Sequence, residues 1–171
     1  YRPEQVDEIY ITHMHGDHIG GLAVGDKRVF PNAVLRIDKA DTDYWLSDEA
    51  MKRAPQDERE GFETAKSMTG PYAAAGKLKP FEGVTQLVPG VTAVPAHGHT
   101  PGHTIYRVDS RDQTLILWGD LMHVAAAQFE NPKIAINFDS DSPRAIVQRE
   151  KAFAEAAGKQ WMVAAAHLSF P

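Results

Sequence analysis

The sequence contains no cysteine among its 171 residues. A disulfide framework, a thiolate nucleophile and a zinc–thiolate site are therefore excluded. Long apolar runs are also missing, since the longest, such as residues 162–166, fall far short of the roughly 20 residues that span a bilayer. We therefore expect no membrane-spanning segment and no membrane partner.

Positive charge is not in excess. The chain has 18 Lys+Arg against 23 Asp+Glu, a formal net charge of −5, and its basic residues are scattered. Nucleic-acid binding needs a concentrated basic face, so we expect no nucleic-acid partner. Repeats, low-complexity stretches and linker-like runs are absent too, and residues 1–171 are predicted to form a single domain.

Short runs of β-branched residues alternate with helical patterns, which predicts a mixed α/β (α+β) fold. Ser142 is the expected N-cap of the last helix, and Gly158 its expected end. Strands are predicted at 6–12, 33–37, 85–88, 91–95, 104–108, 114–118 and 162–166, the last of them buried, and helices at 38–51, 57–75 and 142–157.

Histidine is unusually clustered. Three of the eight histidines, His13, His15 and His18, lie with Asp17 within six residues that directly follow a predicted strand. If the backbone stays extended there, the alternating positions 13, 15 and 17 point the same way. Neutral imidazole and carboxylate are good ligands for zinc and similar divalent ions, so this segment predicts a metal site.

Further ligand candidates stand where other predicted strands end. His99 follows the strand at 91–95, Asp120 follows 114–118, and His167 follows 162–166. Each of these histidines alone would more often be an ordinary hydrogen-bonded residue. Because strand exits at one edge of a sheet can converge, the candidates together predict two coordination sets.

These motifs resemble the metallo-β-lactamase superfamily. The resemblance rests on His-x-His-x-Asp-His at 13–18, His-Thr-x-Gly-His at 99–103, Gly119-Asp120 and a late His167, all in family order. The local wording is most similar to methyl parathion hydrolases and their lactonase relatives. The resemblance implies a four-layer αβ/βα sandwich, of which this chain is expected to lack the N-terminal strands and some residues after His167.

The resemblance also implies a binuclear metal centre of two divalent ions, usually zinc. Two such ions about 3.5–4 Å apart share a hydroxide and polarise a carbonyl or phosphoryl oxygen. We therefore expect a hydrolase that attacks an ester-like small molecule, such as a lactone, an aryl ester or an organophosphate triester. The implied ligands are His13, His15 and His99 for one ion and Asp17, His18 and His167 for the other, with Asp120 bridging both.

Other residues receive roles around this centre. Asp120 and His123 are the predicted catalytic residues, and His123 is also expected to face the substrate, with a solvated loop residue as the alternative. Trp45 and Phe62 resemble the aromatic wall of a substrate pocket, although both also fit as core anchors of their helices. His97 and His103 are expected to orient the metal-binding loop rather than to bind metal.

Several alternatives stay open at this level. A persulfide dioxygenase of the same superfamily uses one iron with a related ligand set, and glyoxalase-type thioesters and β-lactams are alternative substrates. A chain that lacks family segments is also open to inactivity or self-association, including a homodimer. Localisation is not assigned; the resemblance is compatible with export to the periplasm, but no signal region is present in these residues.

Overall fold

The computed structural model describes residues 1–169 and divides into two compact units, unit 1 at Tyr1–Glu82 and unit 2 from Gly83 onward. Positions 170 and 171 of the predicted domain lie outside the described residues. Within the described residues, no helix is long and apolar enough to cross a membrane. Each unit is described by itself.

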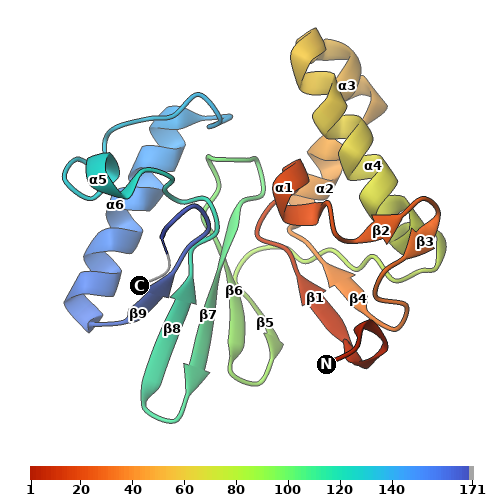
Figure 1. Cartoon of the computed structure of the whole chain (residues 1–171). Coiled ribbons are helices and arrows are strands. Elements are labelled where there is room, and N and C mark those ends of the chain that lie inside the picture. The colour runs from red at the N-terminus through yellow and green to blue at the C-terminus, as the bar shows by residue number, and fades with distance from the viewer. Residues whose placement is uncertain (170–171) are drawn as a thin grey trace. The chain divides into compact units, whose positions relative to one another are not determined.

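Unit 1 contains a small parallel sheet. Strand β1 (Glu8–Tyr10) pairs with β4 (Val34–Arg36), so the segments that follow these two strands leave the sheet at the same edge (Figure 1). A short hairpin of β2 (Ala23–Val24) and β3 (Lys27–Arg28) lies between them in the sequence. Two short helices, η1 (Pro3–Gln5) and α1 (Gly16–Ile19), flank β1.

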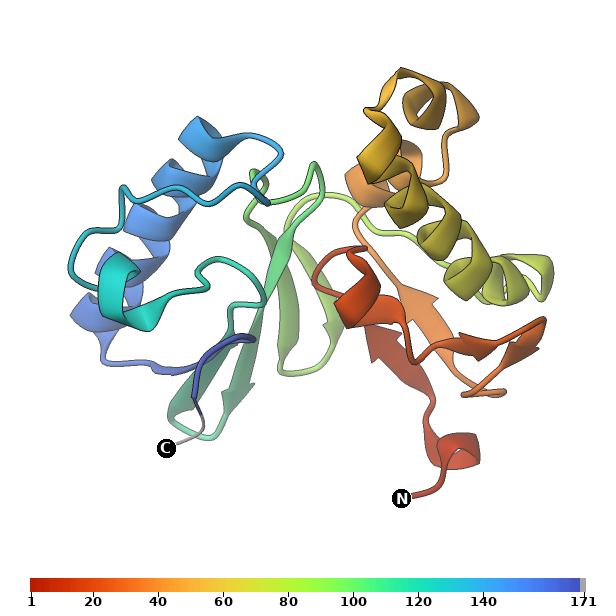
Figure 2. The ribbon, with the colours of Figure 1, turned by 45° about the horizontal axis from the view of Figure 1, so that its top comes forward.

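The remaining helices of unit 1 are α2 (Lys39–Trp45), α3 (Asp48–Arg53), η2 (Gln56–Glu58) and α4 (Arg59–Ala74). The prediction of one helix over 38–51 was wrong, because the Ser47 hydroxyl accepts a hydrogen bond from the Ala50 N–H and starts a second helix. Helices α2 and α4 lie side by side in both views (Figures 1 and 2). Phe62 and Tyr72 of α4 are fully buried in this unit's core.

Unit 2 is built on an open five-stranded sheet in the order β5-β6-β7-β8-β9. Strands β5 (Thr85–Val88), β6 (Val91–Pro95), β7 (Thr104–Ser110) and β8 (Gln113–Leu117) are antiparallel neighbours, and β9 (Met162–Ala164) runs parallel to β8. Strands β6, β8 and β9 therefore all run in one direction, and the loops that follow them leave at the same edge.

Helix α6 (Ser142–Lys159) packs against this sheet, and the short α5 (Ala125–Gln128) precedes it (Figure 2). The predicted cap was wrong by one residue, because the side chain of Asp141, not Ser142, accepts from the Arg144 N–H. Gly158 lies inside the helix, which ends instead where Gln160 adopts a left-handed φ of 55°. The predicted end at Gly158 was therefore also wrong.

Strand β9 is exposed, contrary to the prediction that residues 162–166 form a buried strand. Met162 and Val163 keep 54% and 36% of their surface accessible. An edge strand has a neighbour on one side only, and an apolar run does not reveal that position in the sheet. The predicted α/β class is nevertheless confirmed, with helices and a sheet in each unit.

Candidate metal centre

The loop after β1 gathers the four predicted ligands of unit 1. His13 is fully buried, and its ring centroid lies 4.7 Å from that of His15 and 4.1 Å from that of His18. The predicted extended backbone ends at His15, where α1 begins, so Asp17 and His18 project from a helical turn. His18 Nε2 lies 3.3 Å from Asp17 Oδ2. The loop thus presents the rings and the carboxylate in a compact group.

A buried carboxylate from α2 holds this loop in place. The backbone N–H of Met14 donates to Asp41 Oδ2 at 2.9 Å, and both residues are fully buried. Because β1 and β4 are parallel, α2 starts at the edge where the histidine loop begins, which brings Asp41 to Met14. Thr12 Oγ1 lies 3.1 Å from His13 Nδ1 and fixes that ring further.

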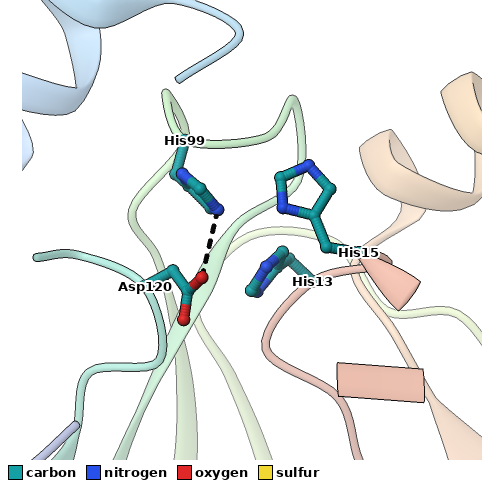
Figure 3. Close-up of side chains that lie close together, drawn as sticks. All are labelled: His13, His15, His99 and Asp120. Carbon is teal, nitrogen blue, oxygen red and sulfur yellow. Dashed lines mark ion pairs between the residues drawn. The ribbon is translucent and has the colours of Figure 1, made fainter. Parts of the chain in front are cut away.

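Three imidazoles of unit 2 converge on one carboxylate oxygen. Asp120 Oδ2 lies 3.0 Å from His123 Nε2, 3.2 Å from His167 Nε2 and 3.4 Å from His99 Nε2. Figure 3 shows the pair of His99 and Asp120, joined by a dashed line. The convergence follows from the topology, since these residues lie in the loops after β6, β8 and β9.

The rings around Asp120 also pack on one another. His123 stacks on His167 with centroids 4.8 Å apart and planes 10° apart, and it lies 5.1 Å from the ring of His99. His167 adopts a left-handed φ of 57°, a conformation uncommon outside glycine. The backbone at His167 is thus held in a strained conformation that brings its ring to the carboxylate.

The two histidines that were expected to orient the loop make other contacts. His103 Nε2 accepts from the backbone N–H of Asp120 at 3.1 Å, so this nitrogen is occupied in positioning Asp120. His97 Nδ1 accepts from Arg144 Nη2 at 3.3 Å, which links the loop to the first turn of α6. Both contacts support a positioning role.

The imidazole of His99 lies between two carboxylates. Its Nε2 faces Asp120, and its Nδ1 lies 3.1 Å from Asp139 Oδ1. Burial lowers the pKa of His99, but the contacts with Asp120 and Asp139 outweigh burial and raise the pKa above its ordinary value. Each ring nitrogen of His99 therefore lies close to a carboxylate oxygen.

The donors of each unit fit a divalent metal. They are imidazole nitrogens and carboxylate oxygens without sulfur, the ligand chemistry of many catalytic zinc sites. In each of the following pairs, the candidate donor atoms lie within 4.8 Å of one another: His13 and His15, and Asp17 and His18, in unit 1; His99 and Asp120, and Asp120 and His167, in unit 2.

The two aromatic residues predicted to contact substrate lie in the core of unit 1. Phe62 has no exposed surface and Trp45 keeps 7%. Their ring centroids lie 4.8 Å apart, and the Trp45 ring also packs nearly perpendicular to that of His15 with centroids 5.4 Å apart. This packing corresponds to the alternative of core anchors, and it gives Trp45 a direct contact with a predicted ligand.

Sequence reasoning missed three residues that organise these loops: Asp41, Asp139 and Arg149. Asp41 lies close to other acidic residues in the sequence, and its contact with the Met14 N–H distinguishes it only in three dimensions. Arg149 could have been found in the sequence, because its helical spacing puts it on the same face of α6 as Ala145, Ala152 and Ala156, which are buried. An arginine flanked by alanines on an inward face indicates a buried guanidinium that has partners.

A family model of the metallo-β-lactamase superfamily matches residues 1–167. The chain therefore belongs to this superfamily, as the motifs predicted. One solved structure, hydrolase AbOPH of the beta-lactamase superfamily, is 32% identical with a TM-score of 0.93 and is matched over 100% of this chain and 60% of that chain. This similarity confirms the predicted fold family.

Two further relatives carry functional descriptions. AidC, a dizinc quorum-quenching lactonase solved with the product N-hexanoyl-L-homoserine, is 28% identical with a TM-score of 0.88 over 100% of this chain and 60% of that chain. The probable metallo-hydrolase Mb2322c of Mycobacterium bovis is 28% identical over 136 residues, 72% of this chain and 39% of that protein. The chain thus spans less than two thirds of the length of each of these relatives.

Proposed function

We propose that this protein is a metal-dependent hydrolase of ester-like small molecules. The observation that carries the proposal is the convergence of His99, His123 and His167 on one oxygen of Asp120. A carboxylate surrounded by imidazoles has the composition of a metal-binding centre, and a carboxylate is able to bridge two divalent ions. Membership of the metallo-β-lactamase superfamily supports the same function.

The proposed centre takes ligands from both halves of the sequence. In our proposal one ion is bound by His13, His15 and His99 and the other by Asp17, His18 and His167, with Asp120 as the bridge. These residues would hold two divalent ions, which we propose to be zinc, and such ions would lower the pKa of a bound water towards neutrality and polarise the bond to be hydrolysed. The dizinc site of the relative AidC supports this number and metal.

The chain's own residues position the reaction. The backbone N–H of Asp120 donates to His103, and its carboxylate contacts the surrounding imidazole rings. His123 keeps 13% of its side chain exposed and lies in the ring cluster, which makes it our candidate for contact with the leaving group. Trp45, whose ring packs against that of His15, is our candidate for contact with an apolar part of the substrate.

A lactone is the substrate that we favour, with aryl esters and organophosphate triesters next. The lactonase AidC supports the first, and all three substrates place an electrophilic centre beside an oxygen that metals polarise. Glyoxalase-type thioesters and β-lactams are the competing substrates. We propose no nucleic-acid or membrane partner, and the homodimer stays a prediction.

Hydrolysis of a substrate panel tests this function. The chain is stripped with a chelator, reloaded with zinc, and assayed on an N-acyl homoserine lactone, an aryl ester, an organophosphate triester, a thioester and a β-lactam. We expect lactone hydrolysis that requires zinc and is lost in Asp120→Asn, whose amide bridges two cations poorly. Zinc-loaded protein that hydrolyses none of the five, or Asp120→Asn with full activity, contradicts the proposal.

A further inference from the structure

The carboxylate of Asp139 lies next to the ring of His99, and no role was predicted for it from the sequence. The side chain of Asp139 is completely buried, and its Oδ1 lies 3.1 Å from Nδ1 of His99. The backbone confirms the close approach, since the N–H of Ser140 donates to the carbonyl of His99 and that of Asp141 donates to the carbonyl of Gly98. Asp139 is thus fixed against the side of the ring that faces away from Asp120.

The partner of Asp139 is a fully buried arginine from the middle of α6. Nη2 of Arg149 lies 3.6 Å from Asp139 Oδ2, and neither side chain has any exposed surface. The other guanidinium nitrogens donate to backbone carbonyls, Nε to Leu121 at 2.7 Å and Nη1 to Pro132 and Ile134 at 2.8 Å each. Arg149 therefore holds the residue next to Asp120 and the segment that leads to Asp139.

We propose that Arg149 and Asp139 form a buried positioning pair that selects the tautomer of His99. The carboxylate accepts the Nδ1 proton, so Nε2 of His99 stays unprotonated and able to bind a metal. Arg149 places a positive charge beside the Asp139 carboxyl where neither side chain has exposed surface. This inference rests on the proposed metal centre and adds two residues that set its affinity without touching the metal.

The chemistry of neutral imidazole explains why such a pair matters. A neutral histidine carries one proton, and the hydrogen bond at one ring nitrogen decides which nitrogen is left to bind a metal. A carboxylate that accepts the proton fixes both the tautomer and the ring orientation, and loss of such a partner typically costs about 10–100-fold in metal affinity. Burial strengthens the selection, because no water competes for Nδ1.

Arg149 makes the effect of an amide at position 139 predictable. In Asp139→Asn, the amide oxygen is drawn towards the guanidinium, which only donates. The amide NH₂ then faces Nδ1 of His99 and donates to it, and the ring proton moves to Nε2, where it competes with the metal. Removing Arg149 as well allows the amide to turn its oxygen towards His99.

The experiment measures zinc affinity by competition with a chelating dye, and it measures His99 ring tautomers by ¹⁵N NMR of the metal-free chain at a pH where the ring is neutral. We expect zinc affinity to fall about 10–100-fold in Asp139→Asn and about 10-fold in Arg149→Met. The double variant should bind zinc more tightly than Asp139→Asn alone. Arg107→Met, which removes the exposed partner of Asp109 in β7, is the matched control and should keep wild-type affinity.

The inference is wrong if metal-free wild-type His99 carries its proton on Nε2, or if Asp139→Asn keeps both the wild-type tautomer and the wild-type affinity. Thermal unfolding in chelator identifies a variant that does not fold. If Arg149→Met does not fold, the nearly isosteric Asp139→Asn still decides through its ring spectrum. Wild-type protein that binds no zinc overturns the proposed function, whereas the tautomer of His99 then tests the positioning pair independently.

Discussion

The two sets of predicted ligands are built in different ways. Four ligands of unit 1 lie within six consecutive residues after β1, and one turn of helix arranges Asp17 and His18. The three of unit 2 come from loops after three different strands and meet at Asp120 only because β6, β8 and β9 run in the same direction. One set is local in the sequence, and the other depends on the sheet.

The residues that hold these ligands in place also differ between the two units. In unit 1, one carboxylate, Asp41, accepts the N–H of Met14 and so fixes the loop through its backbone. In unit 2, Asp139 contacts the ring of His99 directly, and Arg149 ties the connecting segment to α6 through backbone carbonyls. The carboxylate that supports the local loop thus acts on its backbone, whereas the carboxylate that supports the dispersed set acts on a ring.

The largest effect is expected when a ligand is removed from either set. His13→Ala and His99→Ala should each lower zinc affinity by more than about 100-fold, because loss of a direct ligand exceeds the cost of losing a supporting residue. His97→Ala, which loses the contact with Arg144, should cost less than about tenfold. Dye competition measures all three, and equal losses in the three variants would remove the distinction between ligand and support.

The next largest effect concerns the loop after β6, which packs on α6 at Gly98. A Cβ at Gly98, where φ is 151°, would lie 2.3 Å from the backbone nitrogen of Ala145. Gly98→Ala should therefore lower the free energy of unfolding by about 3 kcal/mol, since backbone must move. Gly158→Ala is the control, because a Cβ there meets nothing within 4 Å and should stabilise α6 by about 0.5–1 kcal/mol. Chemical denaturation measures both, and a neutral Gly98→Ala would contradict this packing.

Removing the backbone support of unit 1 should have a moderate effect. Asp41→Ala leaves the buried N–H of Met14 without this acceptor, which should lower the free energy of unfolding by about 1–3 kcal/mol. The same variant should weaken zinc binding about tenfold. Asp43→Ala on the same helix removes only an exposed ion pair with Lys39 and serves as the control. If both variants behave alike, Asp41 does not support the loop.

The smallest effect is expected at an exposed ion pair of unit 1. A hydrogen bond from the Lys66 ammonium holds the pKa of Asp48 below its ordinary value. Any stability from this pair is complete above the pKa that Asp48 has in the unfolded chain, and it is lost as the pH falls through the lowered pKa of the folded state. Lys66→Met should therefore differ slightly from wild type in unfolding midpoint at neutral pH and not at all in acid.

Much of the candidate site could be predicted from the sequence because ligand residues combine a rare type with a diagnostic spacing. The motif at 13–18 and the strand exits at His99, Asp120 and His167 were recognisable for that reason. The residues that hold them were not, since Asp41 and Asp139 are ordinary aspartates until burial selects them. Supporting roles depend on three-dimensional neighbours, and neighbours far apart in the sequence leave no local pattern.

The fold, too, could be predicted only in part from the sequence. Helix α6 and the strands of the unit 2 sheet follow from periodicity and turn residues, whereas the caps at Ser47 and Asp141 depend on which of several competing polar side chains reaches the helix N–H groups. The exposure of β9 was missed because an apolar strand at the edge reads like one in the middle of a sheet. Local chemistry sets the elements, and sheet order sets their burial.

Metal content per chain tests the central claim most directly. The protein is purified without added metal, and its metals are counted by elemental mass spectrometry before and after titration with zinc. We predict two zinc ions per chain, as expected if the ligands of both units serve one binuclear centre. A single iron would favour the dioxygenase alternative, and a chain that takes up no metal at all would contradict the account.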